Sequence, residues 1–154
     1  MNPLRIDYTQ AAPDAFKAML ALEAAVQRSG LEHSLIELVK MRVSQINGCA
    51  YCLDMHSKDA RAAGETEQRL HLLAAWREAP CYSQRERAAL AWAETLTLVS
   101  AQGAPDAAYA SARAQFDDKA LVDLTLAIVA INGWNRLAIG LRSEVGGYVA
   151  HTTR

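Results

Sequence analysis

The chain has 154 residues, a formal net charge of −1 and a hydrophobic fraction of 51%. This length is typical of one domain, and we expect a single domain over residues 1–154. Acidic and basic residues are interspersed and make up 21% of the chain, which argues against a phosphate-binding surface and so against nucleic acid as a partner. The high apolar content leaves room for buried subunit interfaces.

Targeting and membrane signals are weak. Residues 1–16 lack a basic patch followed by an apolar run, so no signal peptide is expected. The segment nearest to a membrane span, 120–141, is too polar for lipid and fits a buried helix better. Its polar residues are Asp123, Asn132, Asn135 and Arg136. We therefore expect a cytoplasmic protein with no membrane association, in a compartment where thiols stay reduced.

Apolar residues recur at helical spacing along most of the chain, and no segment alternates as a strand would. The sequence predicts an all-α bundle of about six to seven helices. In chain order, the expected helices cover residues 13–30, 31–48, 50–64, 66–76, 83–99, 105–116 and 117–143. Residues suited to helix starts support these boundaries. They are Pro13, Thr66, the pair Ser83 and Glu86, and Asp117 with Asp118.

The third expected helix begins with two cysteines and a histidine. If this helix starts near Cys49, then Cys49, Cys52 and His56 share one face of its first two turns. A thiolate at a helix N-terminus is stabilised by the helix dipole, and an imidazole one turn later can take its proton. In a reducing compartment such a pair is typically catalytic or metal-binding.

Glu37 is the candidate partner of His56. The second and third expected helices should pack as an antiparallel hairpin, which places Glu37 nearly level with His56. Glu37 lies about 165° from the stripe of Leu35, Val39, Val43 and Ile46, counting 100° per residue. Solvent exposure is one interpretation of that position. The other is a carboxylate facing the third helix, holding His56 directly or through a water molecule.

This pattern resembles the active-site motif of the AhpD-like alkylhydroperoxidases, in the carboxymuconolactone decarboxylase superfamily. It reads Glu37, eleven residues, Cys49-Ala50-Tyr51-Cys52, three residues, His56. The resemblance extends from about residue 31 through 131–142, and the chain length is that of the single-repeat branch. Some members have histidine where this chain has Tyr51. The lactone decarboxylases of the superfamily lack the cysteine pair, so its presence argues against that activity.

The resemblance implies a fold, an activity and partners. It implies an all-helical trimer or hexamer that reduces hydroperoxides without a cofactor or metal. Cys52 would be the peroxidatic thiolate, Cys49 the resolving cysteine, and Glu37 with His56 the proton relay. The electron donor would be a dithiol on a lipoyl-bearing or thioredoxin-like protein, and a peroxiredoxin is a further candidate partner.

Other interpretations remain open at this stage. The cysteines can be core residues, or they can bind zinc with ligands drawn from His33, His71, Cys81 and His151, none of which is paired at ligand spacing. The absence of a strand before Gly48 argues against a thioredoxin-like site. The alternative functions are a dithiol–disulfide reductase or redox sensor, and a helical oligomeric binding protein with non-catalytic cysteines. Trp134, Asn135 and Arg136 are expected to make a buried polar contact between helices or subunits, or to line the substrate pocket.

Overall fold

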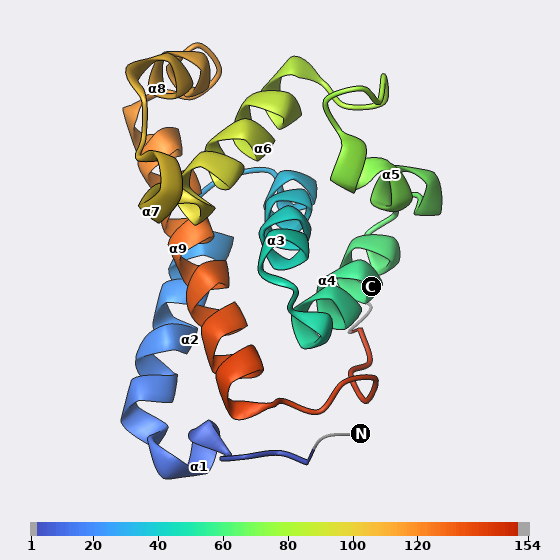
Figure 1. The fold of residues 1–154 in the computed structure, drawn as a ribbon, viewed down its shortest axis with the longest axis vertical. Coiled ribbons are helices and arrows are strands. Elements are labelled where there is room, and N and C mark those ends of the chain that lie inside the picture. Colours follow the sequence, from blue (N-terminus) through green and yellow to red (C-terminus); the bar gives the residue numbers. More distant parts are fainter. Residues whose placement is uncertain (1–2, 151–154) are drawn as a thin grey trace.

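The computed structural model describes residues 3–150, and within them it is entirely helical (Figure 1). The all-α prediction is confirmed. The elements are α1 (Tyr8–Ala11), α2 (Pro13–Gln27), α3 (His33–Asn47), α4 (Ala50–Ala62), α5 (Glu67–Leu72), the 3-10 helix η1 (Leu73–Ala75), α6 (Gln84–Thr97), α7 (Val99–Gln102), α8 (Asp106–Arg113) and α9 (Asp118–Leu141).

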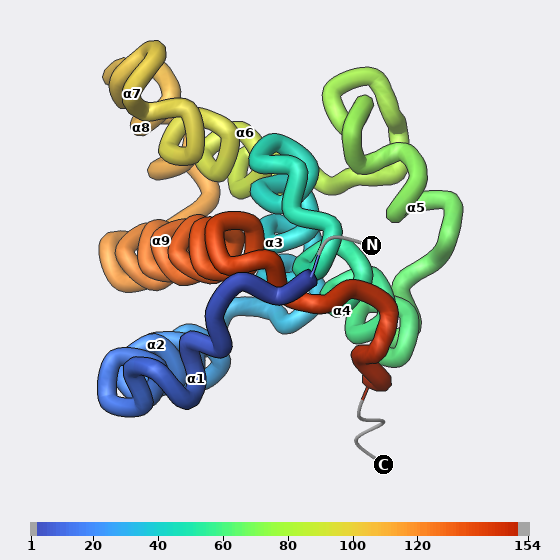
Figure 2. The backbone as a smooth tube through the Cα atoms, turned by 60° about the horizontal axis from the view of Figure 1, so that its bottom comes forward, coloured from blue at the N-terminus to red at the C-terminus, as the bar shows by residue number. Residues whose placement is uncertain are grey.

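Helix α3 lies at the centre of the bundle. It packs against α4, α6 and α9, and both ribbon and tube views place it among them (Figures 1 and 2). Residues 35–41 are all buried, so this helix is covered on every side rather than along one stripe. Polar side chains on α3 are therefore inside the protein, where each needs a partner.

The structure has more helices than expected, because the sequence pattern did not indicate two short ones. Helices α1 and α7 have four residues each, which is too short for apolar periodicity to appear. Asp7 caps α1 by accepting the Thr9 N–H at 2.9 Å, and the Tyr8 ring packs edge-on to Phe16 of α2. The cysteine pair consequently stands at the start of the fourth helix, not the third.

Most helix starts agree with the expected signals. Thr66 caps α5, Ser83 and Glu86 form a capping box on α6, and Asp117 caps α9. The expected helix over 66–76 is instead divided into α5 and η1. The expected helix over 83–99 ends at Thr97, because Leu98 leaves the helical conformation with φ −99° and ψ 22° before α7 begins.

Helix α9 is the one helix within residues 3–150 that is long and apolar enough to cross a membrane by length and composition. In the fold it packs against α2, α3, α4 and α6, with Leu124, Ile128 and Ile131 in the core. The prediction of a buried helix holds for this face only. The opposite face exposes apolar side chains, among them Val122, Leu126 and Val129.

Candidate active site

The turn between α3 and α4 brings the cysteines to a helix start. Gly48 adopts φ 70° and ψ 33°, the left-handed conformation that glycine takes with little strain and that often ends a helix. The Cys49 N–H donates to the Ser44 carbonyl at 3.0 Å, which closes the turn. Cys49 then becomes the N-cap of α4, and its Sγ accepts the backbone N–H of Cys52 at 3.4 Å.

The two thiols are buried and adjacent. Both cysteines are free and only 1% exposed, and their sulfur atoms lie 2.8 Å apart. A disulfide bond is about 2.05 Å long, so a small movement suffices to form one. The geometry thus provides a dithiol that can cycle between reduced and oxidised states.

The pKa values of the two thiols are shifted in opposite directions. A hydrogen bond from the Cys52 thiol lowers the pKa of Cys49 to about 7 against the effect of burial, and the backbone N–H of Cys52 contributes in the same direction. The pKa of Cys52 is raised, first because its proton is shared with Cys49, and also by burial and by the neighbouring negative charge. Within the pair, these effects favour a thiolate on Cys49 over one on Cys52.

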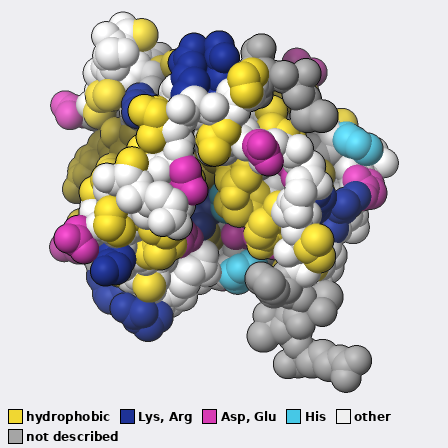
Figure 3. Space-filling model, turned by 90° about the horizontal axis from the view of Figure 1, so that it is seen from below, with side chains coloured by type: hydrophobic (Ala, Val, Ile, Leu, Met, Phe, Trp, Pro, Cys, Tyr) yellow, Lys and Arg dark blue, Asp and Glu magenta, His cyan; other side chains and the backbone are white. Residues whose placement is uncertain are grey.

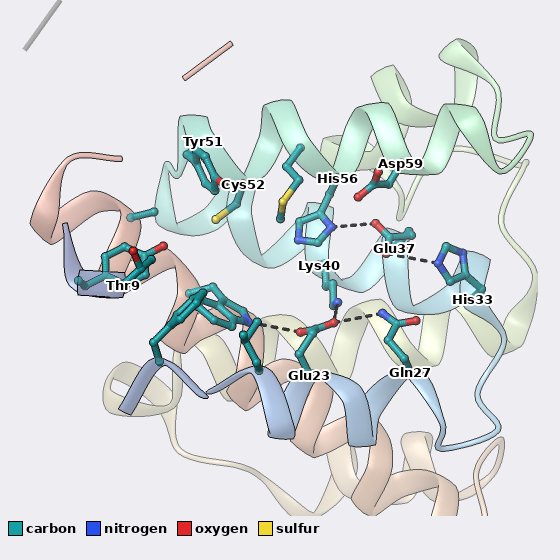
Figure 4. Close-up of a pocket in the computed structure, with 16 residues that line it drawn as sticks. Thr9, Glu23, Gln27, His33, Glu37, Lys40, Tyr51, Cys52, His56 and Asp59 are labelled. Atoms are coloured by element: carbon teal, nitrogen blue, oxygen red, sulfur yellow. Dashed lines mark hydrogen bonds and ion pairs between the residues drawn. The ribbon is translucent and has the colours of Figure 1, made fainter. Parts of the chain in front are cut away.

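Glu37 and His56 meet directly. His56 Nδ1 lies 2.8 Å from Glu37 Oε2, and the residues are 4% and 3% exposed (Figure 4). Burial raises the pKa of Glu37, but the hydrogen bond and charge of His56, with smaller effects of Lys40 and His33, leave the pKa below its ordinary value. Glu37 is thus an ionised acceptor, not a solvent-exposed helix residue.

The other ring nitrogen of His56 has no partner. Its Nε2 is buried and makes no hydrogen bond within the described part of the chain, the two thiols included. A buried polar atom without a partner is uncommon and needs an explanation. His56 also lines a cavity, and because Glu37 holds Nδ1, Nε2 is the ring nitrogen left to exchange a proton with a molecule bound there.

This cavity has a volume of about 420 Å³, and Cys52 lines it together with His56. Cys49 does not. Figure 3 shows hydrophobic side chains gathered around a hollow at this end of the molecule. The apolar lining residues are Phe16, Leu20, Tyr51, Met55, Trp134 and Ala138. The cavity suits a molecule with an apolar body and a reactive polar group directed to Cys52 and His56.

An ion pair that the sequence analysis did not identify forms another wall. Lys40 is 2% exposed, and its ammonium contacts the Glu23 carboxylate of α2. Glu23 also accepts hydrogen bonds from Gln27 at 3.1 Å and from Trp134 Nε1 at 3.3 Å (Figure 4). The position of Lys40, one turn after Glu37 in residues 35–41, which are otherwise apolar, was the available signal for a buried lysine.

The segment 131–136 divides between three environments. Asn135 is fully buried and makes the expected contact between helices, since its Nδ2 donates to Ser44 Oγ at 3.0 Å and its Oδ1 accepts from Asn47 at 2.8 Å. Trp134 lines the cavity. Arg136 makes no such contact with another helix within residues 3–150 of the single chain: it is exposed and donates to the Asn132 carbonyl one turn earlier, so a contact between subunits stays a prediction.

The zinc alternative draws no support from the described residues. Within them, the one group of three side chains close enough to share a metal ion is Glu37, His56 and Asp59, and it contains no cysteine. His33 lies 3.9 Å from Glu37 but belongs to no metal-binding group with the thiols. His151 lies outside the described residues.

Comparison with known proteins shows what the chain as a whole is similar to. The model of the carboxymuconolactone decarboxylase family matches residues 13–95. The uncharacterised protein YdfG of Bacillus subtilis strain 168 is 44% identical over 137 residues, which are 89% of this chain and 93% of YdfG.

Two solved structures share the fold. The Agrobacterium tumefaciens protein ATU0492, a protein of unknown function provisionally assigned to the antioxidant defence protein AhpD, is 50% identical with a TM-score of 0.91, covering 95% of this chain and all of that one. A peroxidase-related protein from Silicibacter sp. TM1040 is 26% identical with a TM-score of 0.75, covering 85% of this chain and 70% of that one.

Proposed function

Since the chain belongs to the carboxymuconolactone decarboxylase family and has an AhpD-like fold, we propose that it is a thiol-dependent peroxidase that reduces hydroperoxides through Cys52 and Cys49. The observation that carries this proposal is the placement of one cysteine of the dithiol and a partnered histidine at one cavity. Cys52 lines the cavity, and so does His56, whose Nε2 is unpartnered while Glu37 holds Nδ1. Relatives described as antioxidant and peroxidase-related proteins support the same reaction class.

The first step uses the short distance between the sulfurs. Within the pair the thiolate is favoured on Cys49, but only Cys52 lines the cavity. A proton shift across the 2.8 Å contact moves the negative charge to Cys52 and leaves Cys49 as the hydrogen-bond donor. Cys52 then attacks the nearer peroxide oxygen, the O–O bond breaks, and the oxygen remains on Cys52 as a sulfenate while the alkoxide leaves.

His56 transfers the proton in this step. With Nδ1–H donated to Glu37, the neutral imidazole has a basic Nε2, which takes the hydroperoxide proton and returns it to the leaving alkoxide. The sulfenate left on Cys52 takes a proton from solvent to become the sulfenic acid. The charge of Glu37 stabilises the imidazolium formed in between. Cys49 next attacks the sulfenic sulfur, forming the Cys49–Cys52 disulfide and releasing water, and an external dithiol restores both thiols.

The test is peroxide-dependent thiol loss. The reduced protein is expected to lose two thiols per chain on adding one equivalent of an alkyl hydroperoxide, and to turn over when a dithiol is supplied. Disulfide formation without peroxide turnover would instead support the dithiol–disulfide reductase or redox sensor, which the lowered pKa of Cys49 also fits. Thiols inert to both treatments would leave the helical binding protein with non-catalytic cysteines.

The proposal includes partners and a location. We infer a cytoplasmic homo-oligomer, a trimer or hexamer, with a lipoyl-bearing or thioredoxin-like protein as electron donor and a peroxiredoxin as a further partner. The exposed apolar face of α9 supports the oligomer. The AhpD-like relatives support the peroxide-related partners.

A further inference from the structure

The dithiol lies between two cavities, and each sulfur belongs to a different one. Cys52 lines the cavity that contains His56. Cys49 lines a second, more open cavity of about 730 Å³ on the other side. Tyr51 and Ala138 line both cavities and so form the wall between them.

The second cavity differs in chemistry from the first. It is formed by the start of α4, the end of α9 and the segment after α9, with Ala50, Ile139 and Val145 among its apolar residues. Its charged residues are Arg142 and Glu144, which are opposite in sign, and neither His56 nor Glu37 reaches it. Among the described residues that line this cavity, none carries an imidazole to protonate a leaving alkoxide, whereas Cys49 is one of the lining residues.

We propose that the second cavity is the entry site of the reductant, an aliphatic dithiol that attacks Cys49 while hydroperoxides reach Cys52 through the first cavity. This inference rests on the proposed peroxidase function and adds to it a separate site for the electron donor. Cys49 is 1% exposed, which excludes a flat protein face, and it lines the second cavity, so the reductant must be slender enough to enter that cavity. The apolar and nearly neutral walls suit an uncharged aliphatic chain.

The exchange balances as two displacements. A thiolate of the reductant attacks Cys49 Sγ, the Cys49–Cys52 bond breaks, and Cys52 leaves as the thiolate. The second thiol of the reductant is then deprotonated and attacks the reductant's first sulfur, the one bonded to Cys49 in the mixed disulfide. This closes the reductant into a cyclic disulfide and releases Cys49, so two electrons have passed to the protein. One proton remains on the cysteine pair and the other is released to solvent.

The leaving group is suited to this direction of attack. The negative charge of Cys49, which raises the pKa of Cys52 in the resting dithiol, is absent once Cys49 is bonded to the reductant. The hydrogen bond with Cys49 that raises the pKa of Cys52 is lost in the same way, and the side chains of Asn135 and Ser44 then act to lower this pKa against the effect of burial. The Cys52 thiolate is therefore released beside the cavity where the next hydroperoxide binds.

Two matched substitutions test the separation of the sites. Leu20 lines the first cavity and Ile139 the second, and they are 46% and 47% exposed, so tryptophan at either position narrows one entrance without disturbing the core. Val99→Trp is the control, because Val99 is 50% exposed and lines neither cavity. The full-length protein is oxidised with diamide, which forms the disulfide without peroxide. Its reduction by dihydrolipoamide is then followed by rapid alkylation and mass spectrometry.

We expect Ile139→Trp to slow reduction of the disulfide about tenfold and to leave oxidation by cumene hydroperoxide within about twofold of wild type. Leu20→Trp should do the reverse, and Val99→Trp should change neither rate. Reduction slowed by Leu20→Trp but not by Ile139→Trp, or slowed equally by both, would overturn the inference. A wild-type protein that peroxide does not oxidise would instead refute the peroxidase function, since the diamide experiment does not depend on it.

Discussion

At the residue scale, the buried pair of Glu37 and His56 distinguishes this dithiol from a pair of core thiols. Two adjacent cysteines inside a bundle need no ionised neighbour. A carboxylate and an imidazole that are both buried cost free energy unless they satisfy each other, and here they do so at 2.8 Å. The unpartnered Nε2 of His56, a residue that lines the cavity, is the part of this arrangement that folding does not explain.

Glu37→Gln should remove the negative charge of this pair while keeping the size of the side chain and its hydrogen bond to His56. The amide can still accept from His56, but it no longer stabilises an imidazolium, so we expect second-order oxidation by hydroperoxide to fall about 100-fold. His56→Ala removes the proton acceptor itself, so its oxidation rate should fall at least as far. Stopped-flow oxidation of the reduced protein measures both rates, and an unchanged rate in Glu37→Gln would contradict the relay.

The same substitution has a pH signature in stability. The pKa of Glu37 is lower in the fold than its ordinary value, so its ionised form stabilises the protein above the unfolded-state pKa of about 4.3. This contribution is lost as pH falls through the lower folded-state pKa. The difference in free energy of unfolding between wild type and Glu37→Gln should therefore shrink as urea titrations move from pH 6 to below about pH 4.

Several donors lower the pKa of Cys49, and the Cys52 thiol has the largest effect. Because the hydrogen bond from Cys52 is the largest cause of its lowered pKa, Cys52→Ala should raise the pKa of Cys49 well above 7. Cys52→Ser keeps a hydroxyl donor at this position and should raise it less. Ultraviolet absorbance of the thiolate against pH measures the change, and equal pKa values in the two variants would mean that the helix start alone stabilises the charge.

At the element scale, the α3–α4 turn determines where the sulfur atoms lie. Gly48→Ala places a Cβ in a left-handed conformation, which should lower the free energy of unfolding by about 1 kcal/mol. Gly140 is a matched control for which the opposite change in the free energy of unfolding is expected. It lies within α9, and a Cβ added there would meet no other atom within 4 Å. Gly140→Ala should therefore raise stability by about 0.5–1 kcal/mol. Chemical denaturation measures the free energy of unfolding of both variants. Destabilisation by both would show that the loss at Gly48 does not come from its left-handed conformation.

The sequence predicted long helices well and short ones poorly. Capping residues such as Thr66 and Ser83 are local signals, and the structure confirms them. Helix α1 has four residues and no periodicity, so its position depends on packing against α2 that the sequence alone does not reveal. The second cavity was unforeseen for the same reason, because it forms where segments distant in sequence meet.

For the candidate site too, the sequence predicted contacts set by spacing but not those set by tertiary packing. Spacing placed Cys49 and Cys52 on one turn and Glu37 level with His56, and the structure brings each pair together. Spacing did not reveal which sulfur lines which cavity, since that depends on α9 and the segment after it. Nor did it reveal the contact of Lys40 with Glu23, because α2 and α3 are brought together by tertiary packing.

At the scale of the whole molecule, α9 leaves an apolar face in need of a partner. Val122, Leu126 and Val129 share that face and are 58%, 39% and 52% exposed. Burial of such a stripe in an oligomer removes it from water, so Val129→Glu should dissociate the assembly toward the 16.8 kDa chain. Ile6→Glu, at another exposed apolar residue, is the control. Light scattering after size exclusion measures the mass, and a wild-type monomer would contradict the expectation.

The measurement that most directly tests the central claim is the site of the first oxygen transfer. Cys49→Ser and Cys52→Ser are each treated with one equivalent of cumene hydroperoxide, trapped with a sulfenic-acid reagent and analysed by mass spectrometry. The account predicts rapid formation of an adduct on Cys52 in Cys49→Ser and little on Cys49 in Cys52→Ser. Equally rapid adduct formation on Cys49, or no oxidation of either variant, would contradict it.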